Sequence, residues 1–291
     1  MDTAGAVSYD SEVNSMKIKL VTDSSANLVT LPDVAFSSVP LKVLVGSREF
    51  SDDSRADVPE MLQALKAHKG PTSTACPSVQ DWLDAFGDAE IVYGAAITSA
   101  LSGCYNAAAI AATEYMEKHP GRKVFLLDSL TTGPELALIM EKFRELSLAG
   151  LPFEAVCEQV RAYAAGTRLM FCLASLDNFA KNGRVSPAVA AAVGILGIRV
   201  VGKASDTGTL EPMHKVRGEK KAIQRLIKTI LESGYRGGKL RIAHTRNPEA
   251  AKDLQGQMQA LYPDADITVC ENRALCAYYA ETGGILIGYE V

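Results

Sequence analysis

The stretch Lys17–Ser24 reads KIKLVTDS, an apolar run that ends in an Asp-Ser pair, and it decides the fold of the first half of the chain. The stretch Lys123–Ser129, KVFLLDS, has the same form further along. Short aliphatic runs separated by segments of helical periodicity are typical of βαβ units built on a parallel sheet. We therefore predict an α/β, doubly wound first half with both Asp-Ser pairs at the carboxyl edge of the sheet. That edge commonly binds ligands, and helix capping is the alternative role of each pair.

The chain is predicted to divide into three parts. Residues 1–15 are polar and aperiodic, so we expect a flexible N-terminal extension. Residues 16–166 form the parallel, doubly wound domain, because the Ala-Ala-Gly sequence that ends at Gly166 is typical of a helix end. Residues 167–291 form a second α/β domain with a mixed sheet, since a hairpin turn is predicted at Asp206–Gly208.

Three helices have clear sequence signals. Asp57 precedes a proline and a glutamate, and Ser78 is followed three residues later by Asp81, as in a capping box. Both serve to satisfy free backbone N–H groups at a helix start. In the second half, an alanine-rich helix is predicted over Pro187–Val193.

The charge balance and the apolar pattern exclude several classes of protein. The 291 residues include 30 Lys and Arg against 34 Asp and Glu, a formal charge of -4, whereas nucleic-acid binders carry a basic surplus. The longest apolar stretch, Ala188–Ile198, is shorter than the ~20 residues that span a bilayer. Met1–Ser15 lacks the basic start and the apolar centre of a secretion signal, so we expect a cytoplasmic protein.

Neither a metal site nor a disulfide framework is indicated. The six cysteines show no C-x-x-C spacing, and the four histidines lie far apart in the sequence. Neither a G-x-G-x-x-G nor a Walker sequence occurs, which argues against nucleotide binding through either loop.

One segment is strongly basic in this acidic chain. Between Glu211 and Arg241 there are nine Lys or Arg against three Asp or Glu. Such a surplus is either the solvated face of a helix or a docking surface for an acidic or nucleotide-bearing partner.

Two loops rich in hydroxyl groups precede predicted helices. Ser73–Ser78 reads STACPS, and Ile97–Gly103 reads ITSALSG. Their O–H and N–H groups can donate hydrogen bonds to an anion, Gly103 allows a close backbone approach, and the helix N-terminus adds partial positive charge. The favoured ligand group is a carboxylate or a phosphate, and plain helix capping is the alternative for each loop.

Acyl-transfer chemistry is a second interpretation of these loops. Ser102 or Cys104 would be the nucleophile, with His214 or His244 as the base. The local sequence lacks a G-x-S-x-G elbow, and no spacing assigns a histidine and an acid to either residue. An acyl or phosphoryl ester hydrolase therefore stays an alternative to a non-catalytic carrier, as does a regulatory module that binds a small anionic metabolite.

A series of short motifs follows Met16 in a specific order. They are Val21–Ser25, Thr74–Ser78, Leu101–Tyr105, Asp128-Ser129, Leu176–Ser186, Gly208–Leu210, Lys215–Gly218, Ile242–His244 and Gly283–Gly288. No single motif is decisive, but their order resembles that of the DegV family of bacterial fatty-acid-binding proteins. The resemblance covers nearly the whole chain after Met16.

The resemblance implies two α/β domains that hold one long-chain fatty acid in an apolar pocket between them. The carboxylate would bind the hydroxyls of Thr74 and Ser102 and the backbone of Gly103. The chain would be a subunit of fatty acid kinase that is not itself an enzyme and needs no cofactor. It would present the carboxylate to a separate ATP-binding subunit for phosphorylation. Arg184 would either hold its own loop through a salt bridge or contact the partner or the transferred phosphate.

One position departs from the family pattern. Family members usually carry His-x-Gly-Pro-Gly near the C-terminus, with the histidine helping to hold the carboxylate, whereas Glu281–Ile285 reads ETGGI here. We predict that Glu281 takes the place of the histidine at the head-group site. Two carboxylates within ~4–6 Å repel each other. Either one is protonated, or Glu281 turns away, or the head group is not a carboxylate.

Overall fold

The first half of the chain is built on a parallel sheet, as predicted. The computed structural model describes residues 16–191 and 197–291, so the predicted extension over residues 1–15 lies outside the described residues. The four strands are all parallel, in the order β2-β1-β6-β7. They are β1 (Ile18–Asp23), β2 (Ala35–Val39), β6 (Ile91–Ala96) and β7 (Lys123–Asp128).

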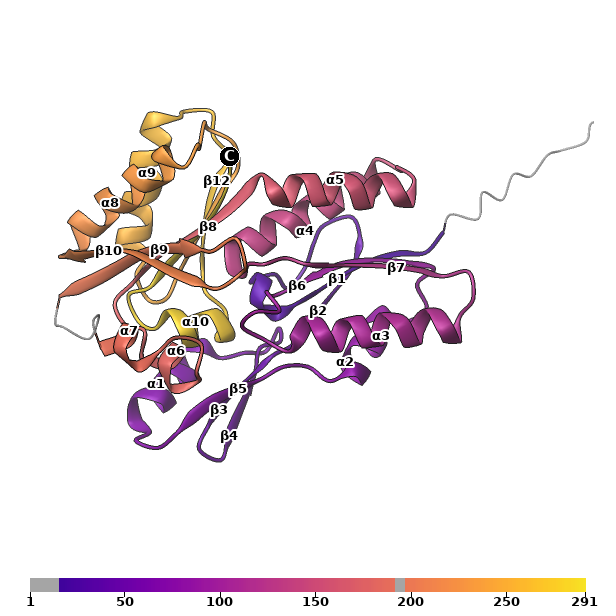
Figure 1. Cartoon of the computed structure of the whole chain (residues 1–291), viewed down its shortest axis with the longest axis horizontal. Helices are drawn as coiled ribbons and strands as arrows, with labels where there is room; N and C mark the ends of the chain where they lie inside the picture. Colours follow the sequence, from indigo (N-terminus) through magenta and orange to yellow (C-terminus); the bar gives the residue numbers. More distant parts are fainter. Residues whose placement is uncertain (1–15, 192–196) are drawn as a thin grey trace, which may run out of the picture.

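Helices cover both faces of this sheet (Figure 1). On one face lie α2 (Val79–Phe86) and α3 (Cys104–Lys118), and on the other lie α4 (Gly133–Leu148) and α5 (Phe153–Ala165). Neighbouring strand residues pack in opposite directions: Leu20 joins the core under α4, whereas Val21 joins the core under α3. Apolar residues on both faces of the sheet are therefore buried under helices, which confirms the doubly wound fold.

The predicted helix starts are confirmed. Asp57 caps α1 (Val58–Ala67) by accepting a hydrogen bond from the backbone of Glu60, and Ser78 forms a capping box with Asp81 at the start of α2. A short 3-10 helix, η1 (Ser24–Ala26), follows β1.

A second, small sheet was not predicted. It consists of β3 (Lys42–Val45), β4 (Arg48–Ser51) and β5 (Thr72–Ala75), all antiparallel. The sequence indicated a loop over Ser73–Ser78, which is wrong for its first three residues. These residues are small and polar, with no aliphatic run, and they extend because β3 supplies the pairing partner.

The second half contains the predicted mixed sheet, in the order β10-β9-β8-β13-β11-β12. Its strands are β8 (Thr167–Leu173), β9 (Ile198–Ala204), β10 (Leu210–Arg217), β11 (Leu240–His244), β12 (Ile267–Glu271) and β13 (Ile285–Glu290). Only β11 and β12 pair in parallel, and the other pairs are antiparallel. The predicted hairpin turn at Asp206–Gly208 joins β9 to β10.

The two faces of the mixed sheet have different neighbours. The amphipathic helix α8 (Glu219–Glu232) and α9 (Pro248–Leu261) bury one face. On the other side lie α4 of the first half and α10 (Ala274–Ala280), with α6 (Asp177–Lys181) beside α10 (Figure 1). The predicted alanine-rich helix is α7 (Pro187–Ala191), and the last two residues of that prediction lie outside the described residues.

The halves are tightly joined where α4 crosses β13. The backbone of Glu135 approaches Gly288 so closely that a Cβ atom there would lie 2.3 Å from the Glu135 nitrogen. The Glu135 carboxylate is buried and accepts a hydrogen bond from the Thr167 hydroxyl at 2.9 Å. Burial raises its pKa to about 7.

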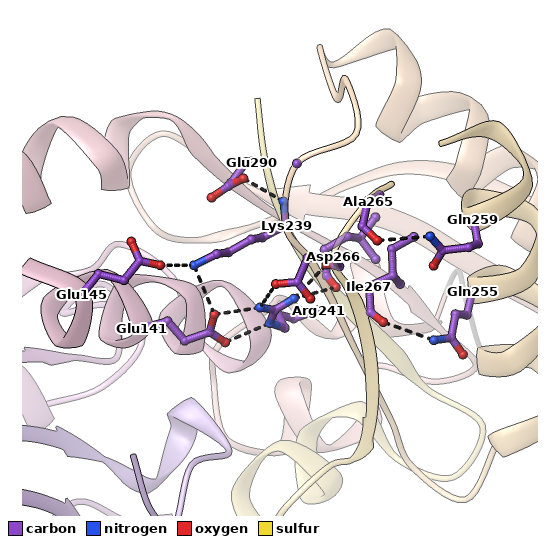
Figure 2. A network of polar contacts seen from close by, with 12 residues as sticks. Glu141, Glu145, Lys239, Arg241, Gln255, Gln259, Ala265, Asp266, Ile267 and Glu290 are labelled. Atoms are coloured by element: carbon purple, nitrogen blue, oxygen red, sulfur yellow. Dashed lines mark hydrogen bonds and ion pairs between the residues drawn. The ribbon is translucent and has the colours of Figure 1, made fainter. Parts of the chain in front are cut away.

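An ionic network completes this junction (Figure 2). Arg241 on β11 donates two hydrogen bonds of 2.8 Å to the two oxygens of Glu141 on α4, and a further one of 2.7 Å to Asp266. Lys239 pairs with Glu145, one turn further along α4. A bidentate Arg–carboxylate pair orients its partners, so the network sets how α4 lies on the mixed sheet.

The division at residue 166 stays a prediction. Gly166 does lie at the turn between α5 and β8. However, α10 from the second half shares one core with β3 and α1 from the first, through residues such as Tyr278 and Met61. The last helix is therefore packed into both halves, and this packing brings C-terminal residues to the small sheet.

Candidate functional site

A cavity lies between the two halves of the molecule. It is lined from the first half by Leu41, Thr74, Ile97, Thr98, Leu101, Ser102, Thr131 and Thr132, and from the second half by Leu169, Phe171, Leu173, Phe179, Arg184, Lys203, Ala204, Gly208, Thr209, Leu210, Leu275, Cys276, Tyr279, Ala280 and Leu286. The alternate residues Leu169, Phe171 and Leu173 of β8 point into it together, because successive strand residues face opposite sides.

The walls of the cavity are largely apolar, and the buried part of its lining also includes Thr98 and Thr131, at 1% and 2% exposed. Phe171, Leu173 and Leu275 on its walls are at most 3% exposed. Thr74 and Ser102, by contrast, are half-buried. The lining residues include no Asp, Glu or His within the described parts of the chain, and the charged members are Arg184 and Lys203. Such a site suits a long apolar ligand that ends in an anion.

Two of the predicted head-group residues line this cavity. Thr74 lies on β5, and Ser102 lies in the loop that leads into α3. The Ser102 hydroxyl accepts a hydrogen bond from the backbone of Cys104 at 3.3 Å. Gly103 is the N-cap residue of α3 and has no side chain to occupy the free N–H groups of the first turn. Gly103 itself is exposed and is not among the lining residues.

Tyr279 is a cavity residue that the sequence analysis missed. It lies on α10, its hydroxyl is 2.9 Å from the Thr74 hydroxyl, and its ring packs on Phe179 with 4.7 Å between the ring centroids. Burial raises its pKa, so the hydroxyl stays protonated. Nothing in the local sequence distinguishes it from its neighbour Tyr278, because only the packing of α10 on the small sheet brings it to Thr74.

Glu281 does not line the cavity. It follows α10 with φ 54° and ψ 171°, a positive-φ conformation that residues other than glycine rarely adopt. Its carboxylate accepts hydrogen bonds from the Ser175 hydroxyl at 3.0 Å and from the backbone N–H of Asn178 at 3.1 Å. Burial raises its pKa. Of the three outcomes that the sequence left open for Glu281, the geometry matches a carboxylate turned toward α6.

Arg184 connects the two halves at the polar end of the cavity. Its Nε donates to the carbonyl of Leu101 at 3.1 Å, and its Nη1 donates to the carbonyl of Asn182 at 2.6 Å. Among residues 16–191 and 197–291, no carboxylate forms an ion pair with it. The guanidinium therefore keeps a positive charge that no neighbouring carboxylate neutralises, next to Ser102.

The two Asp-Ser pairs act on the same loop. Asp23 accepts a 2.7 Å hydrogen bond from the backbone of Ile97, and Asp128 accepts one of 3.0 Å from the backbone of Ser99. Asp23 also caps η1. Neither aspartate lines the cavity. The two aspartates lie on the strands on both sides of β6, and their hydrogen bonds hold the Ile97–Gly103 loop in place. They therefore position the loop without contacting the cavity.

The surroundings of Cys104 do not activate a nucleophile. Its thiol is buried and donates to the carboxylate of Asp23 at 3.4 Å. Burial raises the pKa of the thiol strongly, and the pKa of Asp23 is raised as well. A buried thiol beside a carboxylate is a poor source of thiolate. His244, one of the two candidate bases, is buried beside Asn247 and is not a cavity residue.

A basic groove lies on the other side of the second half. We define it by the residues that line it: Lys215, Val216, Arg217, Lys221, Gln224, Arg225 and Lys228. The cations of α8 follow the spacing of one helix face, and those of β10 follow the alternation of one strand face. In the described residues, Lys228 is the groove cation with an ion pair, to Glu232 at 3.7 Å.

Two kinds of structure are absent from residues 16–191 and 197–291. None of the helices in this part of the chain is long and apolar enough to cross a membrane. No group of three His, Cys, Asp or Glu side chains lies together there in a way that could hold a metal ion.

The fold and the cavity define a ligand-binding protein of two α/β halves, with an apolar cavity between them and hydroxyl groups at its polar end. The chain belongs to the DegV family: residues 17–290 match the family model described as "Uncharacterised protein, DegV family". A DegV domain-containing protein of Streptococcus pneumoniae is 40% identical over 280 residues, which cover 95% of this chain and 100% of the relative.

Two solved structures are similar throughout. The Fatty Acid Kinase (Fak) B3 protein of Streptococcus pneumoniae, loaded with linoleic acid, has a TM-score of 0.93 at 40% identity, over 95% of this chain and 100% of the other. A DegV family protein from Eubacterium eligens, loaded with heptadecanoic acid, has a TM-score of 0.92 at 41% identity, over 94% and 99% of the two chains. The DegV-type α/β fold that the motif order predicted is therefore confirmed.

Proposed function

We propose that this protein binds one long-chain fatty acid in the cavity between its halves and presents the carboxylate to a separate ATP-binding kinase subunit. One observation carries the proposal: the cavity has buried apolar walls, and the half-buried hydroxyls of Thr74 and Ser102 and the Arg184 guanidinium line it together. An amphiphile fits such a site in one orientation, with the chain inside and the carboxylate near the surface. The relatives with linoleic and heptadecanoic acid support this ligand class.

The acyl chain supplies most of the affinity in this proposal. Burying each CH₂ contributes ~0.8 kcal/mol, which gives roughly 10 kcal/mol before the costs of binding for a long chain. Hydrogen bonds from the hydroxyls contribute about 1–3 kcal/mol each to a charged group. The acyl chain therefore provides most of the affinity, and Thr74, Ser102 and Tyr279 orient the carboxylate.

The head group is proposed to lie between the hydroxyls of Thr74 and Ser102, with the start of α3 behind it. Tyr279 holds the Thr74 hydroxyl from α10, so that Thr74 can donate its own proton to the ligand. In the family pattern a histidine near the C-terminus contributes to this site, and Glu281 stands at that position. We propose that Tyr279 supplies the polar contact from α10 and that Glu281 holds the start of α6 instead.

Phosphorylation is assigned to the partner rather than to this chain. The described cavity residues include no general base for Ser102, and the Cys104 thiol is buried and protonated. The unneutralised guanidinium of Arg184, beside Ser102, suits the negative charge that a transferred phosphate brings to the carboxylate.

The basic groove, with its exposed cations, suits an acidic surface of the partner. Both the carrier and this reaction are proposed to be cytoplasmic.

Two measurements test the proposal. Protein purified from a bacterial host is extracted and the lipid identified by mass spectrometry, and we expect about one fatty acid per chain. Reloaded protein is then incubated with ATP and a bacterial fatty acid kinase ATP-binding subunit, and we expect acyl phosphate only when both proteins are present. Protein that holds no fatty acid and ignores added fatty acid contradicts the carrier role. Ester hydrolysis by this chain alone supports the hydrolase.

A further inference from the structure

Behind the apolar wall that β8 gives the cavity lies one position without a side chain, Gly202 on β9. On β8, Phe171 and Leu173 point into the cavity, and the neighbouring strand β9 pairs Gly202 with Phe171 and Val200 with Leu173. Strand alternation puts Val200, Gly202 and Ala204 on one face of β9. Ala204 lines the cavity, whereas Gly202 does not.

The ring of Phe171 covers Gly202. A Cβ atom at position 202 would lie 2.4 Å from Cζ and 2.6 Å from Cε2 of that ring, closer than any non-bonded carbon pair allows. The φ angle of Gly202 is not positive, so its backbone is one that other residues adopt. The need for glycine at this position is therefore a need for space. An aromatic ring that lies across a cross-strand glycine is a known way to shield such a position.

We infer that Gly202 sets the width of the acyl-chain cavity by allowing the Phe171 ring to lie against the sheet. This inference rests on the proposed fatty-acid ligand and makes the Gly202–Phe171 pair a determinant of acyl-chain specificity. Gly202 is a positioning residue, because it acts through Phe171 and does not touch the cavity. With any larger residue at 202, the ring has to turn away from β9, and the open space on its other side is the cavity.

The opposite side of Gly202 offers no easier relief. The same Cβ atom would lie 2.5 Å from the backbone carbonyl oxygen of Glu211 on β10. That carbonyl belongs to a strand paired with β9 over residues 198–204, with a register shift between Pro212 and His214. Both contacts have to be relieved at once, so an added Cβ atom displaces the Glu211 carbonyl as well, and the Phe171 ring, as a side chain, makes the larger movement.

The consequence for the ligand is a preference by shape. A narrower cavity at Phe171 excludes chains that are long or bent by cis double bonds before it excludes short, straight ones. Each methylene that loses its place in the cavity weakens binding about fourfold, since burial of a CH₂ contributes ~0.8 kcal/mol. A wider cavity at this point has the opposite effect.

The test compares Gly202→Ala, Phe171→Leu and the double variant with the wild type. Each protein is incubated with an equimolar mixture of saturated fatty acids of 14, 16 and 18 carbons and cis-unsaturated ones of 18, and bound lipid is quantified by mass spectrometry. We expect Gly202→Ala to lose the 18-carbon cis-unsaturated acids by at least about fourfold relative to the 14-carbon acid. Phe171→Leu should shift the ratio the other way, and the double variant should regain the longer chains.

Matched controls separate specificity from general damage. Gly256→Ala on α9 adds a methyl group where no atom lies within 4 Å, and Phe125→Leu shortens a core ring outside the cavity. Neither should change the acyl profile. If Gly202→Ala does not fold, the acyl-chain profile of Phe171→Leu alone tests the inference. A profile equal to that of the wild type overturns the inference and leaves the fatty-acid carrier intact, whereas wild-type protein without any fatty acid overturns both.

Discussion

The hydroxyl groups of Thr74 and Tyr279 lie 2.9 Å apart, although 205 positions separate them in the sequence. The contact joins the small antiparallel sheet to the last helix at the polar end of the cavity. It gives α10 a part in the proposed head-group site through Tyr279, a residue that belongs to none of the sequence motifs.

Tyr279→Phe should weaken fatty-acid binding by about 1 kcal/mol, because Thr74 loses the hydrogen bond that orients its hydroxyl. The ring stays and keeps its contact with Phe179, so the melting temperature should change little. Affinity is measured by titration of lipid-free protein with a fluorescent fatty acid. Tyr262→Phe, which removes a hydroxyl far from the cavity, is the control. Equal affinity of Tyr279→Phe and the wild type places the head group elsewhere.

Ser102→Ala should weaken binding by about 2 kcal/mol, since a donor to a charged group is lost. The substitution also removes the acceptor of the Cys104 N–H, so the melting temperature is measured beside the affinity. The start of α3 keeps its free N–H groups, so some affinity for the carboxylate remains. The same titration, repeated with a fatty-acid methyl ester, checks the assignment. The ester should bind the wild type and the variant equally. If the variant binds both the acid and the ester more weakly by the same factor, Ser102 contributes to binding of the acyl chain and not of the carboxylate.

Glu281→Gln should leave fatty-acid affinity unchanged from pH 6 to pH 8, because the carboxylate is bound to Ser175 and Asn178 rather than to the head group. Stability should respond instead. The folded-state pKa of Glu281 is raised, so the ionised form costs the folded protein stability as pH rises, and glutamine removes that cost. Tighter binding by Glu281→Gln at pH 7 would place the carboxylate at the head group after all.

Arg184→Ala should bind fatty acid normally and fail in the reconstituted phosphorylation, because the role proposed for its charge is in the transfer step, and apolar walls hold the acyl chain. Loss of the contact with Leu101 should lower the melting temperature only slightly. Acyl phosphate formation with the kinase subunit is the measurement, and Arg236→Ala is the matched control. Wild-type activity in Arg184→Ala would remove this residue from the transfer step.

Glu135→Gln should stabilise the protein at pH 8 and change its stability little at pH 4. The folded-state pKa of Glu135 is about 7, above its ordinary value of 4.5. Between these values the unfolded chain ionises and the folded chain does not, so stability falls as pH rises, by about 3 kcal/mol in all. Urea unfolding at several pH values measures this slope. Parallel curves for variant and wild type would show that Glu135 ionises as freely in the folded state.

Much of the fold could be read from the sequence because the signals involved are local. The aliphatic runs at β1 and β7, the capping residues Asp57 and Ser78, and the hairpin turn at Asp206–Gly208 each depend on neighbours within a few residues. The order of the motifs predicted the family. The family pattern in turn predicted Thr74 and Ser102 as site residues, and both line the cavity.

Tertiary structure alone decided what surrounds the ligand. The strand Thr72–Ala75 forms only because β3 lies beside it, and Tyr279 reaches Thr74 only because α10 packs into both halves. The direction of the Glu281 carboxylate depends on Ser175 and Asn178, more than a hundred residues before it. Sequence patterns report the preferences of a chain segment for water, for helix or for strand. They do not report which side chain from a distant part of the sequence packs beside that segment. Such contacts between distant segments determine the shape of the cavity.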